Sequence, residues 1–306
     1  MDNFDNKFDD KFNDKINDKF NDNFKNYSYK NYKKYILKVA KIILEPIKNR
    51  KYKLKYYLEQ FENVLKNYTK WNIINNTNNK NKFHYKSIYN EYRKWIKHNI
   101  FEISFNYFIK ENYVKLFKIM DNSNFNLFVD VSKFSNKYGN EYVFKNNEYM
   151  KKNITPIMVI CNEDKIPLCF SVLNESNKSN INNKKNKYHE HEIKHVNELL
   201  KKIPFNIKQN NVNINIIGDK GYITNEKFKI FNKEVKIITP LRKNNKNKSL
   251  NDNEISLLKK RHKIENYFSY LKNYDRLNVR KDRKINNYCG FIYMSMLDLI
   301  FKKVIL

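Results

Sequence analysis

The sequence predicts an α/β protein in which helices flank a mixed sheet, preceded by an all-helical N-terminal region. Apolar residues between about residues 27 and 120 recur at helical spacing, without strand-like runs. Strand-like runs begin at Phe125, first consecutively and then alternating with helical segments. Consecutive strands followed by such alternation are typical of a mixed sheet covered by helices.

The first 26 residues repeat a four-residue unit with Phe or Ile at every fourth position. On a helix this spacing drifts by about 40° per repeat, so no apolar stripe forms. The segment holds five Lys and seven Asp, a charge of 5 − 7 = −2, opposite in sign to the rest. We interpret residues 1–26 as a disordered low-complexity tail; the alternative is an arm that masks a basic surface.

Residues 27–122 form the predicted helical region. Helices are expected at 35–44, which ends before Pro46, at 54–65 and at 85–96, which is strongly amphipathic. Short helices around a basic loop are compatible with a helix-turn-helix-like DNA-binding unit, and equally with a plain helical bundle.

Residues 123–306 form the predicted α/β region, and its elements are listed here. Strands are expected at 127–133, 156–162, 167–173, 212–218 and 235–239, and helices at 191–202, 225–231, 253–272 and 285–304.

The charge balance points to a polyanionic partner. The 306 residues carry a net charge of 61 − 32 = +29, while 41% of them are hydrophobic and can build a core. The alternative is A/T-rich codon usage acting on an ordinary soluble surface, because Asn, Lys, Ile, Tyr and Phe are all abundant.

The cysteines and apolar runs indicate an intracellular protein. Cys161, Cys169 and Cys289 are unevenly spaced, which favours reduced thiols over disulfides or a zinc site. No apolar run reaches 18 residues, so we expect no transmembrane helix and no membrane partner. The spacing H-x-H-x3-H at residues 189–195 could bind zinc, but without an evident fourth ligand a polar helix start is favoured.

Three acidic residues on separate elements are the candidate catalytic residues. Asp130 lies within the first strand, Asp219 follows the fourth, and Glu265 lies on the helix after the fifth. Carboxylates that converge in this way repel one another unless they hold cations. Two divalent ions, Mg²⁺ or Mn²⁺, would relieve that repulsion and serve displacement at phosphorus. Two of only four glycines, Gly218 and Gly221, flank Asp219, which indicates a positive φ or a close backbone approach.

The helix that carries Glu265 has the spacing R-x3-E-x6-K. Arg261, Glu265 and Lys272 fall within a sector of about 40° beside an apolar stripe. Glu265 could then reach a metal while the two cations reach phosphates. The alternative is an ordinary i,i+4 ion pair with a solvated lysine.

These residues resemble the DDE transposases of bacterial-type insertion sequences, over most of residues 50–300. That family has a ribonuclease-H-like catalytic domain with a mixed five-stranded sheet, expected here at 123–306. The resemblance is carried by the Val-Asp-Val-Ser run at 129–132, Gly-Asp-Lys-Gly-Tyr at 218–222, Thr-Pro-Leu-Arg at 239–242 and the R-x3-E-x6-K helix at 261–272. His191-Glu192, Tyr138-Gly139-Asn140, Trp71 and the helix at 85–95 are also similar to family positions.

The resemblance implies a DNA transposase that hydrolyses phosphodiesters at transposon ends and joins the freed 3′-hydroxyl to target DNA. Asp130, Asp219 and Glu265 would be the catalytic metal ligands. Contacts to DNA phosphates are implied for Arg261 and Lys272, with Lys220 and Arg242 as helpers. The partners would be double-stranded DNA and further copies of the chain, in a DNA-associated, intracellular setting.

Two positions depart from the family pattern, and two rival functions stay open. Leu258 stands where the family often has Tyr, and Lys165 where it often has Gly. The alternatives are a structure-selective nuclease that cuts without joining strands, and a catalytically decayed DNA-binding derivative.

Overall fold

The computed structural model describes most of the chain between Tyr32 and Val304. The described ranges are 32–44, 51–67, 70–76, 84–117, 124–145, 153–173, 195–204, 213–223, 228–230, 233–241 and 249–304. The tail predicted at residues 1–26 lies outside them.

The helical region forms where the apolar periodicity predicts it. Its elements are α2 (Tyr32–Leu44), α3 (Leu54–Lys66), the 3-10 helix η1 (Trp71–Asn76), α4 (Tyr85–Lys97) and α5 (Ile100–Phe117). The buried residues of α3 recur at i, i+1, i+4, i+7 and i+8 from Tyr57, which gives one apolar face. The helices predicted at 35–44, 54–65 and 85–96 are therefore confirmed to within three residues at each end.

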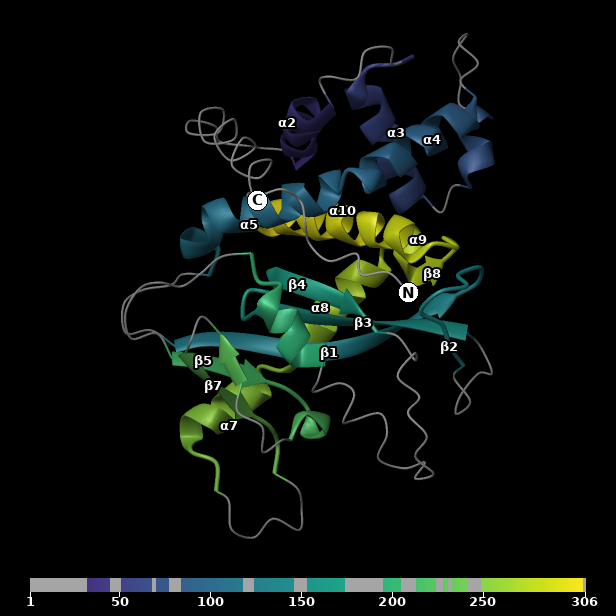
Figure 1. The fold of residues 1–306 in the computed structure, drawn as a ribbon. Helices are drawn as coiled ribbons and strands as arrows, with labels where there is room; N and C mark the ends of the chain where they lie inside the picture. Colours follow the sequence, from purple (N-terminus) through teal and green to yellow (C-terminus); the bar gives the residue numbers. More distant parts are fainter. Residues whose placement is uncertain are drawn as a thin grey trace.

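The predicted mixed sheet is confirmed (Figure 1). Its five main strands are β1 (Asn124–Asn136), β3 (Asn153–Asn162), β4 (Pro167–Val172), β5 (Asn213–Ile217) and β7 (Lys233–Ile238). They lie in the order β4-β3-β1-β5-β7. β3 runs antiparallel to both β4 and β1, whereas β5 runs parallel to β1 and β7 parallel to β5. This is the ribonuclease-H-like arrangement that the resemblance implies.

The sheet is wider than the five strands expected. Three short strands, β2 (Phe144–Lys145), β6 (Phe228–Ile230) and β8 (Val279–Arg280), bring the described sheet to eight. Strands of two or three residues carry no periodic signal, so they were not predicted. The helix predicted at 225–231 is wrong in its described part, because β6 pairs antiparallel with β7. Pairing with β7 in a hairpin stabilises a strand here more than the local sequence favours a helix.

The helix predicted at 253–272 is broken in two. It forms α7 (Asp252–Lys259) and α8 (His262–Lys272), with Lys260 and Arg261 in the turn between them. In the turn, the N–H groups of Lys260 and Arg261 bond to carbonyls three residues back, those of Leu257 and Leu258, in 3-10 fashion. The helix α9 (Asp275–Asn278) follows, and α10 (Ile285–Val304) coincides with its prediction. Of the helix predicted at 191–202, residues 195–201 are described and helical.

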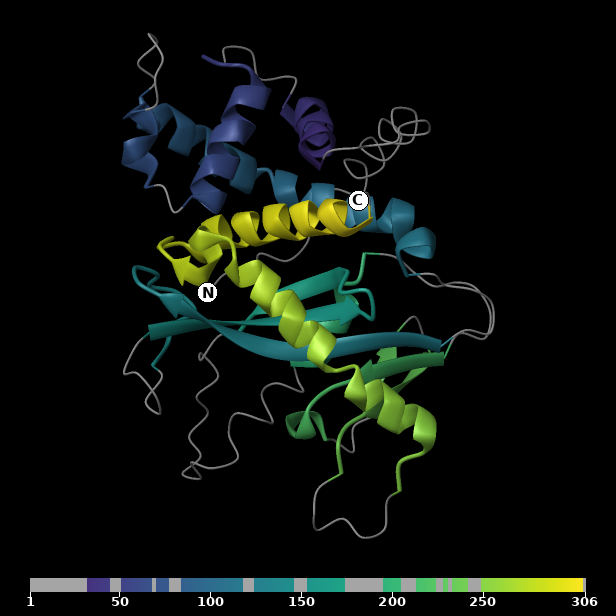
Figure 2. The ribbon, with the colours of Figure 1, turned by 180° about the vertical axis from the view of Figure 1, so that it is seen from behind.

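The two faces of the sheet carry different helices. Asp130 pairs with Val159 and Val159 with Phe170, so these three side chains project from one face. The Phe170 ring lies 4.7 Å from Tyr293 of α10, and α8 crosses the same face (Figure 2). On the other face, the Cys169 thiol donates to the Leu199 carbonyl of the helix at 195–201.

The N-terminal helices and the sheet share one hydrophobic core. A single cluster of buried apolar side chains extends from Tyr32 to Phe301. The helix α10 lies alongside α5, beneath α2, α3 and α4 (Figures 1 and 2), and Phe291 stacks on Tyr92 with ring centroids 4.6 Å apart. The described helices α2 to α5 therefore belong to the same packed core as the C-terminal helix. The role of the region 27–122 in DNA binding stays a prediction.

The turn between β3 and β4 explains one departure from the family pattern. Lys165 has φ of 62°, in the left-handed region that favours glycine. Its N–H donates to the Asn162 carbonyl and closes the turn, so the strained lysine is held by the hairpin. Glycine would adopt this conformation without the cost of about 1 kcal/mol.

Among the described helices, none combines the length and apolar composition that crossing a bilayer requires.

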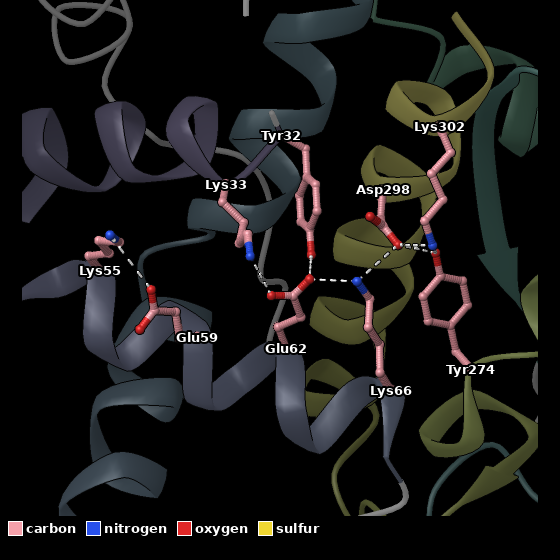
Figure 3. Close-up of polar contacts among 9 residues, drawn as sticks. All are labelled: Tyr32, Lys33, Lys55, Glu59, Glu62, Lys66, Tyr274, Asp298 and Lys302. Carbon is pink, nitrogen blue, oxygen red and sulfur yellow. Dashed lines mark hydrogen bonds and ion pairs between the residues drawn. The ribbon is translucent and has the colours of Figure 1, made fainter. Parts of the chain in front are cut away.

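A polar network ties α2 and α3 to α10 (Figure 3). Glu62 accepts hydrogen bonds from Tyr32, Lys33 and Lys66 at 2.8, 2.7 and 2.5 Å. Lys66 also lies 3.6 Å from Asp298 of α10, which is 5% exposed. The Asp298 carboxylate is further held by the Tyr274 hydroxyl at 2.5 Å and Lys302 at 2.7 Å. A buried charge is stable only when it is paired. Each charged group of this network has such a partner.

Glu62 makes the network sensitive to acid. Burial raises its pKa, but the hydrogen bonds from Lys33, Lys66 and Tyr32 outweigh burial and lower the pKa to about 2. Because the folded-state pKa lies below that of the unfolded chain, this stabilisation is complete above about pH 5 and is lost as the pH falls toward 2. We expect Glu62→Gln to lower the free energy of unfolding by about 2 kcal/mol at pH 7, and by much less near pH 2.

Urea denaturation at both pH values measures this difference. The control is Glu59→Gln, because Glu59 makes a longer, exposed ion pair with Lys55 at 3.9 Å on the same helix. An equal loss for Glu62→Gln at both pH values would contradict the assignment of its low pKa.

Candidate metal and phosphate site

Parallel pairing of β1 with β5 aligns two of the three predicted acids. The last paired residues are Phe128 and Ile217, an offset of 217 − 128 = 89. Asp130 and Asp219 have the same offset, 219 − 130 = 89, so the register continued by two residues sets them opposite each other. Neighbouring strands lie about 4.8 Å apart. The two acids therefore belong to adjacent chain segments at the end of β5.

Asp219 is fixed by the turn that follows β5. It caps the 3-10 turn η2 (Lys220–Tyr222), and its Oδ1 accepts the Gly221 N–H at 2.7 Å. No described glycine has a positive φ, so close approach is the reason for Gly218. A Cβ added there would lie 2.7 Å from Cδ2 of the Tyr222 ring. The tight packing of Tyr222 on Gly218 holds the backbone that carries Asp219.

Glu265 approaches the same site on α8, and Arg261 joins it to Asp130. Arg261 Nη1 lies 3.5 Å from Asp130 Oδ2, and Nη2 lies 2.5 Å from Glu265 Oε1. One guanidinium therefore contacts two carboxylates that come from a strand and a helix. Sequence spacing predicted the pair within the helix; the contact with Asp130 depends on how α8 crosses the sheet.

Asp130 is in an environment that disfavours its charge. Burial, together with the charges of Asp219 and Glu265, raises its pKa to about 6, against the lowering effects of the Val131 N–H and Arg261. Both neighbouring acids thus act on Asp130 across space. A half-buried carboxylate beside two others is stabilised when a cation is added.

The donor set suits Mg²⁺ or Mn²⁺, which prefer carboxylate oxygens. Within the described ranges, no three His, Cys, Asp or Glu side chains are close enough together to hold a metal ion. At the three acids, the Arg261 guanidinium provides the positive charge between two of them. Their roles as metal ligands therefore stay proposals. For the zinc alternative, His189 and His191 lie outside the described residues, and His195 contacts Glu198 at 3.3 Å.

The other residues predicted to contact phosphate do not cluster around the acids as Arg261 does. Lys272 lies at the far end of α8, with its Nζ 5.4 Å from the Phe134 ring, and burial lowers its pKa. Phe134 follows Asp130 by four residues on β1, so Lys272 lies over the same sheet face. Lys220 is exposed beside Asp219, and Arg242 lies outside the described residues.

Sequence reasoning missed the contacts that fix the α7–α8 turn. Lys260 Nζ lies 2.9 Å from Glu163 Oε2, and Asn126 Nδ2 donates to Glu163 Oε1 at 3.0 Å. This chain of contacts connects the turn to the β3–β4 loop and to β1, next to Arg261. The residues are 97 and 37 positions apart, and no motif marks them.

Arg280 is a second residue that the sequence did not single out. It is fully buried, and its guanidinium donates to the Glu141, Asp282 and Arg283 carbonyls and to Thr155 Oγ1. These bonds tie the residues after β1 to the segment after α9. They support the fold around the site and make no contact with the three acids.

A cavity of about 270 Å³ lies away from the acids, between α7 and the start of β5. Asn124, Asn213, Asn215, Asn251 and Asn253 contribute half of its ten lining residues. None of the predicted site residues lines it.

Neutralising Asp130 should stabilise the protein when no metal is present. Its folded-state pKa is raised above the unfolded value, so the stability penalty is absent below about pH 4 and complete above about pH 7. We expect Asp130→Asn to raise the free energy of unfolding by about 1–2 kcal/mol at pH 8, with no gain at pH 4. Chemical denaturation in EDTA tests this; a loss of stability at pH 8 would refute the destabilising environment.

A methyl group at Gly218 should disturb the Asp219 turn. Gly218→Ala forces the Tyr222 ring to shift, because the new Cβ would lie within 3 Å of it. We expect a loss of about 1–3 kcal/mol in thermal unfolding measurements. The double variant Gly218→Ala/Tyr222→Ala removes the clash, so its stability should equal that of Tyr222→Ala alone, which is the control.

Comparison with known proteins finds a family that matches part of the chain. Residues 181–285 match the family model described as "Transposase DDE domain", and this range includes Asp219, Arg261, Glu265 and Lys272 but not Asp130. No curated protein matches the chain. A solved structure of the piggyBac transposase synaptic complex with hairpin DNA superposes with a TM-score of 0.42 at 9% identity, over 94% of this chain and 70% of that chain. A superposition this loose carries no functional argument. The family model thus supports the resemblance stated from the sequence: residues 181–285 are similar to the transposase DDE domain.

Proposed function

We propose that this chain is a DDE transposase that cuts and joins DNA at a site formed by Asp130, Asp219 and Glu265. The observation that supports this most directly is the Arg261 bridge between Asp130 and Glu265, together with the register that aligns Asp130 with Asp219. One acid on β1, one in the turn after β5 and one on α8 would then border a shared position on the sheet face.

The three carboxylates would hold one or two Mg²⁺ or Mn²⁺ ions. When bound, such ions lower the pKa of water and stabilise the leaving oxygen in displacement at phosphorus. The protein's own contribution is to fix the ligands: the Val131 N–H orients Asp130, and the Gly221 N–H orients Asp219. Preset ligand directions reduce the reorganisation needed when substrate binds.

Double-stranded DNA is the proposed substrate. The net charge of +29 favours a polyanion. Arg261, Lys272, Lys220 and Arg242 are proposed to contact phosphates near the scissile bond. Because two transposon ends must be cut and joined together, we propose that the active form contains more than one copy of the chain.

Replacing one acid should separate chemistry from binding. We expect Asp219→Asn to lower Mg²⁺-dependent strand cleavage at least 100-fold on DNA that includes the sequences flanking the coding region, while the Kd for that DNA changes less than about threefold. The reason is that the amide is a poor metal ligand but preserves the bond from the Gly221 N–H.

The matched control is Asp252→Asn, an exposed acid on α7, which should cleave like the unaltered protein. Retained cleavage by Asp219→Asn would refute the assignment. The products of the unaltered protein then decide the reaction: joined strands indicate a transposase, whereas cut but never joined strands indicate a nuclease.

A further inference from the structure

Arg261 occupies the carboxylate oxygens that a metal ion would need. Asp130 Oδ1 accepts the Val131 N–H at 2.8 Å, and Asp130 Oδ2 faces Arg261 Nη1 at 3.5 Å. Glu265 Oε1 is taken by Arg261 Nη2 at 2.5 Å. An ion shared by Asp130 and Glu265 would therefore compete with the guanidinium for at least one of these atoms.

The backbone at Arg261 is fixed, whereas its side chain has room to move. Arg261 lies in the α7–α8 turn with φ of −56° and ψ of −31°, and its N–H bonds to the Leu258 carbonyl. The neighbouring Lys260–Glu163 contact fastens this turn to the β3–β4 loop. The Arg261 side chain is 28% exposed, so it can turn toward solvent without unpacking the core.

The two arrangements differ in charge balance. With the guanidinium in place, one positive charge serves two carboxylates, one of them half-exposed. A divalent ion held by these oxygens would bring twice the charge, and it would compete with the arginine for them. The released guanidinium remains beside the site with its donors free, and a phosphate is the acceptor that its planar fork suits best.

We propose that Arg261 is a positioning residue that substitutes for the metal in the DNA-free protein and moves to a DNA phosphate when the metal binds. This rests on the proposed function, since it requires the three acids to be metal ligands. It predicts that Arg261 opposes metal binding when DNA is absent. It also predicts that metal and DNA strengthen each other's binding, because each relieves the cost that the other meets.

Metal affinity without DNA tests the first part. We expect Arg261→Gln to bind Mn²⁺ about five- to tenfold more tightly than the unaltered protein in calorimetric titration, because the competing cation is gone. Arg261→Lys should lie in between, since an ammonium is a single point charge and cannot bridge both acids. The matched control is Lys259→Gln, which removes an exposed cation two residues away and leaves the Lys260–Glu163 contact in place; its affinity should change less than twofold.

DNA affinity with and without metal tests the second part. A short duplex is titrated in EDTA and in Ca²⁺, and the ratio of the two Kd values gives the coupling. In EDTA, Arg261→Gln should bind the duplex like the unaltered protein, because the arginine is held by the acids. In Ca²⁺ it should bind about fivefold more weakly, so the coupling ratio falls, whereas Lys259→Gln should keep the full ratio.

The outcomes separate this inference from the proposed function. Unchanged or weaker Mn²⁺ binding by Arg261→Gln, while Asp219→Asn abolishes that binding, overturns the role of Arg261 and leaves the metal site standing. If Asp219→Asn binds Mn²⁺ as tightly as the unaltered protein does, both the metal site and this inference are overturned.

Discussion

Parallel pairing between β1 and β5 is the constraint on which the rest of the site depends. Its offset of 89 residues aligns Asp130 with Asp219, at a point where the β5 ladder has just ended and the chain is free to turn. A slip of one residue would move one acid to the opposite face of the sheet. The buried residues along both strands fix this register, so the hydrophobic core determines the distance between the charged groups.

This register brings acidic side chains close together, and Arg261 reduces the repulsion between them. A buried carboxylate beside two others raises the free energy of the folded chain, which is why the pKa of Asp130 is raised to about 6. The break between α7 and α8 sets Arg261 where one guanidinium contacts Asp130 and Glu265 together. A continuous helix over 253–272 would change the direction from which Arg261 approaches the sheet, so the break is part of how the site is formed.

The N-terminal helices are connected to the sheet through α10. Tyr92 of α4 packs on α10, and the network of Glu62, Lys66 and Asp298 joins α2 and α3 to the same helix. On its opposite side α10 meets Phe170 of β4, in the sheet that carries Asp130. A movement of the N-terminal helices on binding a partner would therefore displace α10 first, and α10 would pass the displacement to the sheet.

The five main strands and four of the helices could be predicted from the sequence, because periodicity is a local property of the chain. The choice of Asp130, Asp219 and Glu265 rests on short motifs, and their role as metal ligands stays a prediction. The same local signals failed at 225–231, where pairing with β7 decided the structure, and at 253–272, where the turn at Lys260 and Arg261 has no helix-breaking residue. Gly218 was marked by its rarity, but its reason, contact with the Tyr222 ring, needed three-dimensional packing. Only the tertiary structure decided that Arg261 reaches Asp130 as well as Glu265, that Glu163 anchors the α7–α8 turn, and that Asp298 is a buried partner of three side chains. Each of these contacts joins residues far apart in the chain, and its energy depends on a distance of a few ångströms that spacing along a sequence does not contain.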